Sequence, residues 1–139
     1  MVDFKMWQLQ NRPSLTEQIT RWLELQSKDP QTWSSCSFEA QKIQLLLRNR
    51  TNDIPEECLV IASFFLPEEL QRQGIFKSFI NYLTEISPWK TIVIEDVSNE
   101  NLVRFCEKYK FKAVSPMYET SYQIQKEQLP KFNVPKFQH

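Results

Sequence analysis

Gly74 is the only glycine in this chain of 139 residues, and it lies in the segment PEELQRQGIFKSF, residues 67 to 79. Average usage would give about ten glycines in such a chain. A helical pattern begins just after Gly74, and helix amino termini present unpaired N–H groups that bind phosphates. Glycine lets a ligand approach the backbone and tolerates positive φ. We therefore interpret the N–H groups of Gln71 to Phe76 as a candidate phosphate cradle, with a tight turn that binds no ligand as the alternative.

Histidine and cysteine offer little further chemistry in this sequence. The single histidine, His139, is the last residue, and the three cysteines, Cys36, Cys58 and Cys106, are widely spaced. This spacing provides neither a disulfide framework nor a Cys-x-x-Cys metal site. Since histidine ligands are also lacking within the chain, we expect no metal centre.

The hydrophobic pattern places Gly74 between a strand and a helix. Residues 58–66, CLVIASFFL, form the clearest strand pattern, and apolar residues recur with a helical period from Phe76 onward. A second strand is predicted at residues 91–97, followed by a helix that ends near Tyr109 and by two short strands, KFKAV and TSYQIQK. A right-handed crossover makes the first two strands parallel neighbours. Gly74 then lies at the carboxyl edge of the sheet, where open sheets bind ligands.

The amino-terminal half gives weaker signals. Its pattern predicts a weak strand over residues 3–9, a helix from the Ser14–Glu17 capping box to about residue 28, a loop or short strand over 31–40, and a strand over 42–50. A helix is the alternative for the last of these segments. We favour a strand there, because the turn-like segment TNDIPEE joins it to the strand at 58–66 as an antiparallel hairpin.

Two strings in the second half resemble the acetyl-CoA-binding core of the GCN5-related N-acetyltransferase (GNAT) superfamily. They are FFLPEELQRQGIFKSFINYL and, further on, TIVIEDVSNENLVRFCEKYKF. The family's pyrophosphate loop is matched by Gln71, Arg72, Gln73, Gly74, Ile75 and Phe76, with Gly74 at its obligatory glycine. The string FCEKYKF is similar to the family's later helix end. The resemblance covers residues 58–126, whereas residues 1–50 match only in outline.

This resemblance implies a fold and a domain organisation. We expect one α+β, three-layer domain over residues 1–139, with a twisted, mixed, largely antiparallel sheet flanked by helices. Residues 1–50 would form the family's variable half, residues 58–126 the acetyl-CoA-binding core, and residues 127–139 an extended tail. The implied activity is acetyl transfer from acetyl-CoA, the cosubstrate, to a primary amine on a small molecule or a peptide.

The resemblance also implies where the coenzyme binds. In the family, backbone N–H groups at the splayed end of the central strand polarise the thioester, which corresponds here to the segment Phe64, Phe65 and Leu66. Asn99 matches an asparagine that contacts the coenzyme, although a helix N-cap is the alternative role. Phe76 departs from the pattern, since the family has a second small residue there, and its place on the apolar stripe explains it as core. Lys110 likewise replaces a glycine.

Acetyl transfer needs a base for the amine and an acid for the departing thiolate. Cys106 stands where many family members carry the tyrosine that protonates the thiolate, so it is one candidate acid, and Tyr109, on the same helical stripe, is another. Either side chain could instead be core. Glu95 and Asp96 lie on one predicted strand and point to opposite faces, so Glu95 is a candidate base. A solvated or salt-bridged carboxylate is its alternative.

Charge and hydropathy exclude several classes of partner. The chain has 17 basic and 17 acidic residues, so no overall field favours nucleic acid. Its longest apolar run, Cys58–Ile61 followed by Ala62, is far shorter than the ~20 residues that span a membrane. With no leader pattern at the amino terminus, we expect a cytoplasmic protein that could form a homodimer. The alternative function is a catalytically divergent GNAT-fold protein that acts as a CoA-binding regulatory or protein-interaction module.

Overall fold

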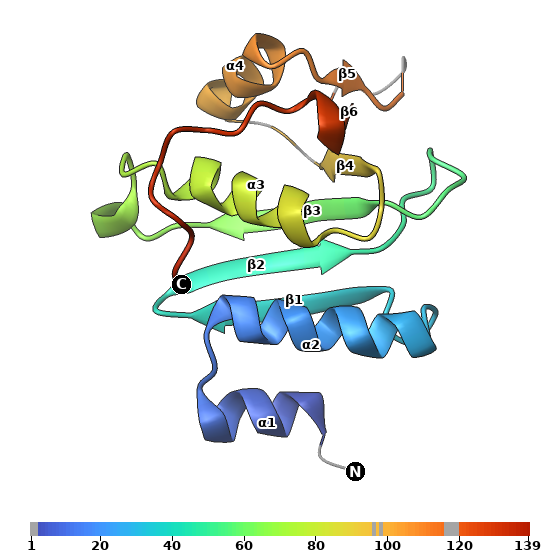
Figure 1. Cartoon of the computed structure of the whole chain (residues 1–139), viewed down its shortest axis with the longest axis vertical. Coiled ribbons are helices and arrows are strands. Elements are labelled where there is room, and N and C mark those ends of the chain that lie inside the picture. Colours follow the sequence, from blue (N-terminus) through green and yellow to red (C-terminus); the bar gives the residue numbers. More distant parts are fainter. Residues whose placement is uncertain (1–2, 96, 98, 116–119) are drawn as a thin grey trace.

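A computed structural model describes residues 3–95, 97, 99–115 and 120–139 (Figure 1). The helices and strands of these residues are α1 (Phe4–Asn11), α2 (Leu15–Lys28), β1 (Ser35–Ala40), β2 (Ile43–Arg48), β3 (Leu59–Phe65), α3 (Ile75–Ile86), β4 (Thr91–Ile94), α4 (Glu100–Lys108), β5 (Lys112–Ala113) and β6 (Tyr122–Gln125). Single 3-10 turns lie at Glu68–Leu70 and Lys126–Gln128.

The strands form one mixed sheet in the order β1-β2-β3-β4-β6-β5. Only β3 and β4 pair in parallel among the described strands, and the other four pairs are antiparallel. The predicted hairpin between residues 42–50 and 58–66 is confirmed as β2 and β3. The predicted parallel neighbours are confirmed as β3 and β4. The fold is therefore α+β, with a largely antiparallel mixed sheet flanked by helices.

The strand predicted over residues 3–9 is wrong, because this segment forms helix α1. Asp3 caps the helix by accepting a hydrogen bond from the Lys5 N–H at 3.3 Å. Phe4 and Trp7, three residues apart, share a helical face, and their ring centroids lie 5.5 Å apart. Met6 and Leu9 remain 46 % and 67 % exposed, so the apparent alternation did not reflect burial.

The helix predicted to start at Ser14 is confirmed as α2. Ser14 Oγ accepts a hydrogen bond from the Glu17 N–H at 3.2 Å, and the Glu17 carboxylate accepts one from the Ser14 N–H at 3.4 Å. This reciprocal capping box satisfies two otherwise free helix donors. Residues 31–40, for which the sequence predicts a loop or a short strand, contain β1, whose side chains alternate between exposed and buried.

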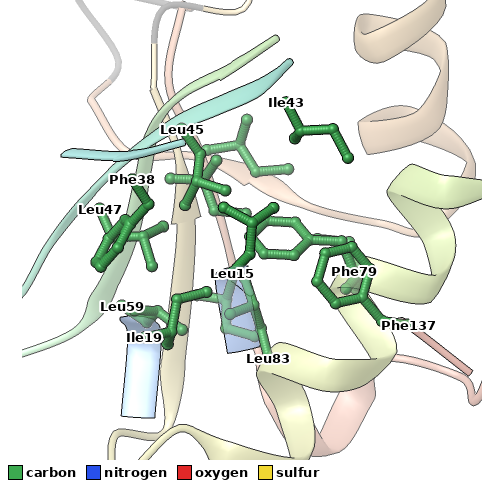
Figure 2. Close-up of a cluster of buried hydrophobic side chains, with 14 of the residues drawn as sticks. Leu15, Ile19, Phe38, Ile43, Leu45, Leu47, Leu59, Phe79, Leu83 and Phe137 are labelled. Carbon is green, nitrogen blue, oxygen red and sulfur yellow. The ribbon is translucent and has the colours of Figure 1, made fainter. Parts of the chain in front are cut away.

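Helices α2 and α3 pack against the same face of the sheet. Phe38, Leu45 and Phe64 are cross-strand partners on β1, β2 and β3, so their side chains share that face. Trp22 of α2 contacts Phe38, and Phe79 of α3 stacks on Phe64 with centroids 4.9 Å apart. Figure 2 shows the resulting core, in which Phe38 and Leu45 lie with Phe79.

The opposite face of β1, β2 and β3 is much less covered. Ser37, Leu46 and Ser63 are cross-strand partners on this face, and the two serines are exposed. A small second cluster of Cys58, Val60 and Val93 lies toward the other end of the strands. This asymmetry leaves an accessible sheet surface near the carboxyl end of β3.

The segment after β6 is extended, and it packs firmly across α3 (Figure 1). The Asn81 side chain donates to the Phe132 carbonyl and accepts from the Phe132 N–H, each at 2.9 Å. Phe137 stacks on Tyr82 and is 4 % exposed. The end of the chain reaches the β1–β2 turn, where His139 Nδ1 lies 3.0 Å from Gln41 Oε1.

Candidate functional site

The connection from β3 to α3 is held in shape by its own side chains. The Gln71 amide donates to the Leu66 carbonyl at 3.0 Å, and the Gln73 amide donates to the Glu69 carbonyl at 2.8 Å. Arg72 and Gly74 both have positive φ, 65° and 75°. Gly74 is the N-cap of α3, and its positive φ is one that glycine adopts without steric cost.

This turn presents a run of free backbone donors. Among the described residues, the N–H groups from Arg72 to Lys77 donate to no protein acceptor, and the first N–H of α3 to do so is that of Ser78, which donates to the Gly74 carbonyl at 3.0 Å. Helices α1, α2 and α4 each have a side-chain cap, whereas Gly74 offers none to α3. Together with the helix dipole, these donors favour an anion.

Gly74 also has a reason to be glycine that involves no ligand. A Cβ atom at this position would lie 3.2 Å from Cγ1 of Val134, in the segment that crosses α3. Such a contact is closer than carbon atoms normally pack, and the positive φ adds strain for any side chain. The two interpretations of Gly74, phosphate cradle and tight turn, are therefore compatible with the same backbone.

Strands β3 and β4 diverge toward this turn. Their last paired residues are Ile61 and Ile94, and the Glu95 N–H adds one bond to the Ile61 carbonyl at 3.0 Å. β3 continues to Phe65 along β2, with Ala62 as an extra residue at a register shift opposite Leu46 and Leu47. Within the described chain, the backbone of Phe64 and Phe65 therefore has no strand partner on the β4 side.

Phe76 fills the space between β3, α3 and α4. Its ring lies 5.3 Å from the Phe64 ring and 5.3 Å from the Phe105 ring, both in edge-on arrangement. Such contacts stabilise aromatic clusters beyond simple burial. The side chain that replaces the family's second small residue is thus packed within the protein.

Glu95 lies in an ion pair at the end of β4. Its carboxylate accepts a hydrogen bond from Arg48 of β2 at 2.7 Å and lies 3.5 Å from the Thr51 hydroxyl. The Glu95 side chain is 16 % exposed. Of the two interpretations offered for this carboxylate, the salt-bridged one is the observed arrangement. Asp96, its neighbour, lies outside the described residues.

Of the two candidate acids, Cys106 lies on α4, and Tyr109 is the partly buried C-cap residue of that helix. Cys106 is 0 % exposed, and burial raises the pKa of its thiol to about 12. Tyr109 caps the end of α4, with its ring between those of Phe105 and Phe132, each 4.9 Å away. No contact among the described residues joins either side chain to Glu95. The three candidate catalytic residues are therefore not assembled into one constellation in this arrangement.

Asn99 is the N-cap of α4, which is the alternative to the coenzyme contact that the resemblance implies. Its side-chain oxygen accepts a hydrogen bond from the Asn101 N–H at 2.8 Å at the start of α4. This bond occupies the oxygen, while the amide NH₂ group has no acceptor within the described part of the chain. Coenzyme contact through that group remains geometrically compatible with the cap.

A cavity of about 1020 Å³ lies at the same end of β3, on the less covered face of the sheet. Its lining comes from α1, the α1–α2 turn, β1, β2 and the end of the chain, and it includes Lys5, Gln8, Arg12, Glu39, Gln44 and Ser63. The sequence did not indicate this cavity, because the segment at residues 3–9 was interpreted as a strand. Lys5 lies on α1 and Arg12 is the C-cap residue of that helix, and both line the cavity.

The described part of the chain contains no group of three or more histidine, cysteine or acidic side chains arranged to hold a metal ion. None of its helices is both long enough and apolar enough to span a membrane.

No protein-family model matches the chain, and no curated protein shows significant sequence similarity to it.

Proposed function

We propose that this protein is an acetyl-CoA-dependent N-acetyltransferase of the GNAT type that acts on a primary amine. The observation that carries the proposal is the run of free N–H groups from Arg72 to Lys77 at the start of α3. They lie at the end of the sheet where β3 and β4 diverge. A strand end without a partner beside a helix amino terminus suits a ligand with a thioester at one end and phosphates further along.

Each part of the site has a separate role in this proposal. The N–H groups of the Gly74 turn bind the pyrophosphate, and Arg72, whose side chain has no ion-pair partner among the described residues, adds positive charge. An N–H group of the segment Phe64 to Leu66 that points away from β2 donates to the thioester oxygen as negative charge develops there. The amine enters from the side of Ser63, where the cavity of about 1020 Å³ opens.

The transfer forms a C–N bond to the acetyl carbonyl and breaks its C–S bond. The amine loses one proton in this step, and the departing thiolate gains one. Glu95 can accept the amine proton through water if the Arg48 pair loosens. For the thiolate, solvent is the donor most consistent with the packing, because the Cys106 thiol is fully buried and the Tyr109 ring lies between two phenylalanines.

Calorimetric titration with acetyl-CoA tests this proposal. We expect saturable binding of acetyl-CoA. Arg72→Glu should lower the affinity about tenfold, because it repels the phosphates while Gly74 itself is unchanged. Lys90→Glu, another exposed charge reversal outside the turn, is the matched control and should bind normally. Gly74→Trp should abolish binding by deforming the turn, because its side chain meets Val134 and is strained at positive φ, and circular dichroism verifies that the variant is folded. Absence of any binding to the unmodified protein would contradict the coenzyme proposal.

A second candidate function is a module that binds the coenzyme without transferring acetyl groups. It is favoured by the interior position of Cys106 and by the Glu95–Arg48 ion pair, which leave neither the Cys106 thiol nor the Glu95 carboxylate free. Release of free CoA thiol across a panel of primary amines distinguishes the two functions. Turnover supports the transferase, and full turnover of a Cys106→Ala variant would remove Cys106 from the mechanism.

A further inference from the structure

The side of Gly74 that lacks a Cβ atom is already filled by another part of the chain. Cγ1 of Val134 lies 3.2 Å, and its Cβ 3.8 Å, from the position that a Cβ atom of Gly74 would take. Carbon atoms pack best at about 3.5–4.0 Å, so a phosphate group, which is larger than a methyl group, cannot enter this space while Val134 is in place. The open side that glycine offers to a ligand is thus covered by residues 129–139, here called the crossing segment.

The crossing segment also joins α3 to α4. The Phe132 ring lies 4.9 Å from the ring of Tyr109, the C-cap residue of α4, and Nζ of Lys77 on α3 lies 5.7 Å from the Phe132 ring. Gly74, Lys77 and Asn81 are three and four residues apart, so they lie along one side of α3. Because Phe132 contacts Asn81 and Val134 contacts Gly74, the segment follows α3 toward its amino terminus (Figure 1).

The crossing segment can leave α3 without opening the sheet. Its residues take part in none of the strand pairings of the described sheet. Its backbone is held by the two hydrogen bonds to the Asn81 side chain and by the Thr16 N–H, which donates to the His139 carbonyl at 3.3 Å. Pro130 and Pro135 have no N–H group to donate. A segment held mainly by side-chain contacts can open locally while the rest of the fold stays intact.

We propose that the crossing segment is an autoinhibitory strap that competes with the coenzyme for the Gly74 turn. In the closed arrangement, Val134 covers Gly74 and Phe132 connects α3 with α4. In the open arrangement, the phosphates of the coenzyme contact the backbone of the turn from the side that Val134 has left. The identity of the competing ligand as acetyl-CoA rests on the proposed function. Since segment and ligand exclude each other, each weakens the binding of the other by the same factor.

Calorimetric titration of strap variants with acetyl-CoA tests this inference. Apparent affinity is reduced by the fraction of protein that is open, so a change that favours opening should tighten binding. Asn81→Ala removes both hydrogen bonds to the Phe132 backbone, and we expect it to bind acetyl-CoA at least fivefold more tightly than the unmodified protein. Asn133→Ala, an exposed neighbour in the segment, is the matched control and should bind like the unmodified protein.

A second variant makes the test independent of Asn81. Val134→Ala removes the Cγ1 atom beside Gly74 and leaves the Asn81 hydrogen bonds in place, so it should also tighten acetyl-CoA binding. Circular dichroism of each variant verifies folding.

Proteolysis of the unmodified protein measures the reciprocal effect. Saturating acetyl-CoA should accelerate trypsin cleavage after the exposed Lys131 at least fivefold, because the bound ligand holds the segment open. Sodium chloride at equal ionic strength is the control and should leave the cleavage rate unchanged. Protection of Lys131 by acetyl-CoA would overturn the inference, since the segment would then form part of the coenzyme site.

The outcomes separate this inference from the proposed function. Saturable acetyl-CoA binding of equal affinity in the unmodified, Asn81→Ala and Val134→Ala proteins would overturn the inference and leave the proposed function intact. Equally tightened binding in the Asn133→Ala control would overturn it too, because the gain would not depend on the contacts with α3. If neither the unmodified protein nor the opened variants bind acetyl-CoA, the proposed function fails, and the inference fails with it, since opening the segment uncovers no site.

Discussion

Gly74 illustrates how one residue can satisfy two demands. The sequence places it at a strand-to-helix turn, where positive φ and close ligand approach both favour glycine. The structure adds Val134, sixty residues later, whose Cγ1 atom lies 3.2 Å from the position that a Cβ atom would take. Sequence reasoning could identify the turn from local residue types, but it could not identify a contact from a segment so distant along the chain.

A double-mutant cycle between Gly74 and Val134 separates the two demands. We expect Gly74→Ala to lower the free energy of unfolding by about 2 kcal/mol, since alanine is strained at a φ of 75° and its Cβ meets Val134. In a Val134→Ala background the same change should cost about 1 kcal/mol, the backbone strain alone. Denaturant titration of the four proteins measures both values. Equal costs in the two backgrounds would show that the Val134 contact does not restrict this position.

At the scale of elements, the strength of the periodic pattern decides what the sequence predicts. Helix α2 was predictable because its capping box and apolar stripe agree, and β2, β3 and β4 were predictable from their apolar runs. Helix α1 was not, because its eight residues contain exposed Met6 and Leu9 beside buried Phe4. The misassigned element is also the wall of the cavity, so the candidate acceptor site could not be found before the helix was known.

The segment after β6 shows a second limit at this scale. Its two prolines, Pro130 and Pro135, suggest an extended tail and indicate no packing partner, yet Phe132 and Phe137 are buried against α3. The two hydrogen bonds of Asn81 to the Phe132 backbone act like one unit of a strand ladder. A side-chain amide thus replaces a strand partner, which no periodicity in the sequence reveals.

Asn81 should determine how firmly this segment is held. We expect Asn81→Ala to free the segment, because the Phe132 N–H and carbonyl lose their partners, at a cost of about 1–3 kcal/mol. Trypsin cleavage after Lys131, which is exposed, should accelerate at least tenfold relative to the unmodified protein. Asn133→Ala, an exposed neighbour, is the matched control. Unchanged cleavage in the Asn81 variant would mean that the aromatic contacts alone hold the segment.

At the scale of the whole molecule, the sheet must protect its outer edge. β1 forms one edge of the described sheet, so its outward carbonyls could pair with another chain. The Ser37 carbonyl accepts from the Gln8 amide at 3.1 Å, and the Glu39 carbonyl accepts from the Gln18 amide at 3.0 Å. Gln18 is itself buried and accepts from Gln8 at 2.8 Å. Two glutamines from α1 and α2 therefore occupy the acceptors that a further strand would use.

Removing both glutamines should convert this edge into an interface. We expect the Gln8→Ala and Gln18→Ala double variant to self-associate more strongly, since the carbonyls of Ser37 and Glu39 become available to a strand of a second molecule. Sedimentation velocity over a range of concentrations measures the association. Ser14→Ala is the control, because loss of its cap costs about 1 kcal/mol without exposing the edge. If both variants associate to the same extent, reduced stability and not the open edge is the cause, and the glutamines contribute only to folding.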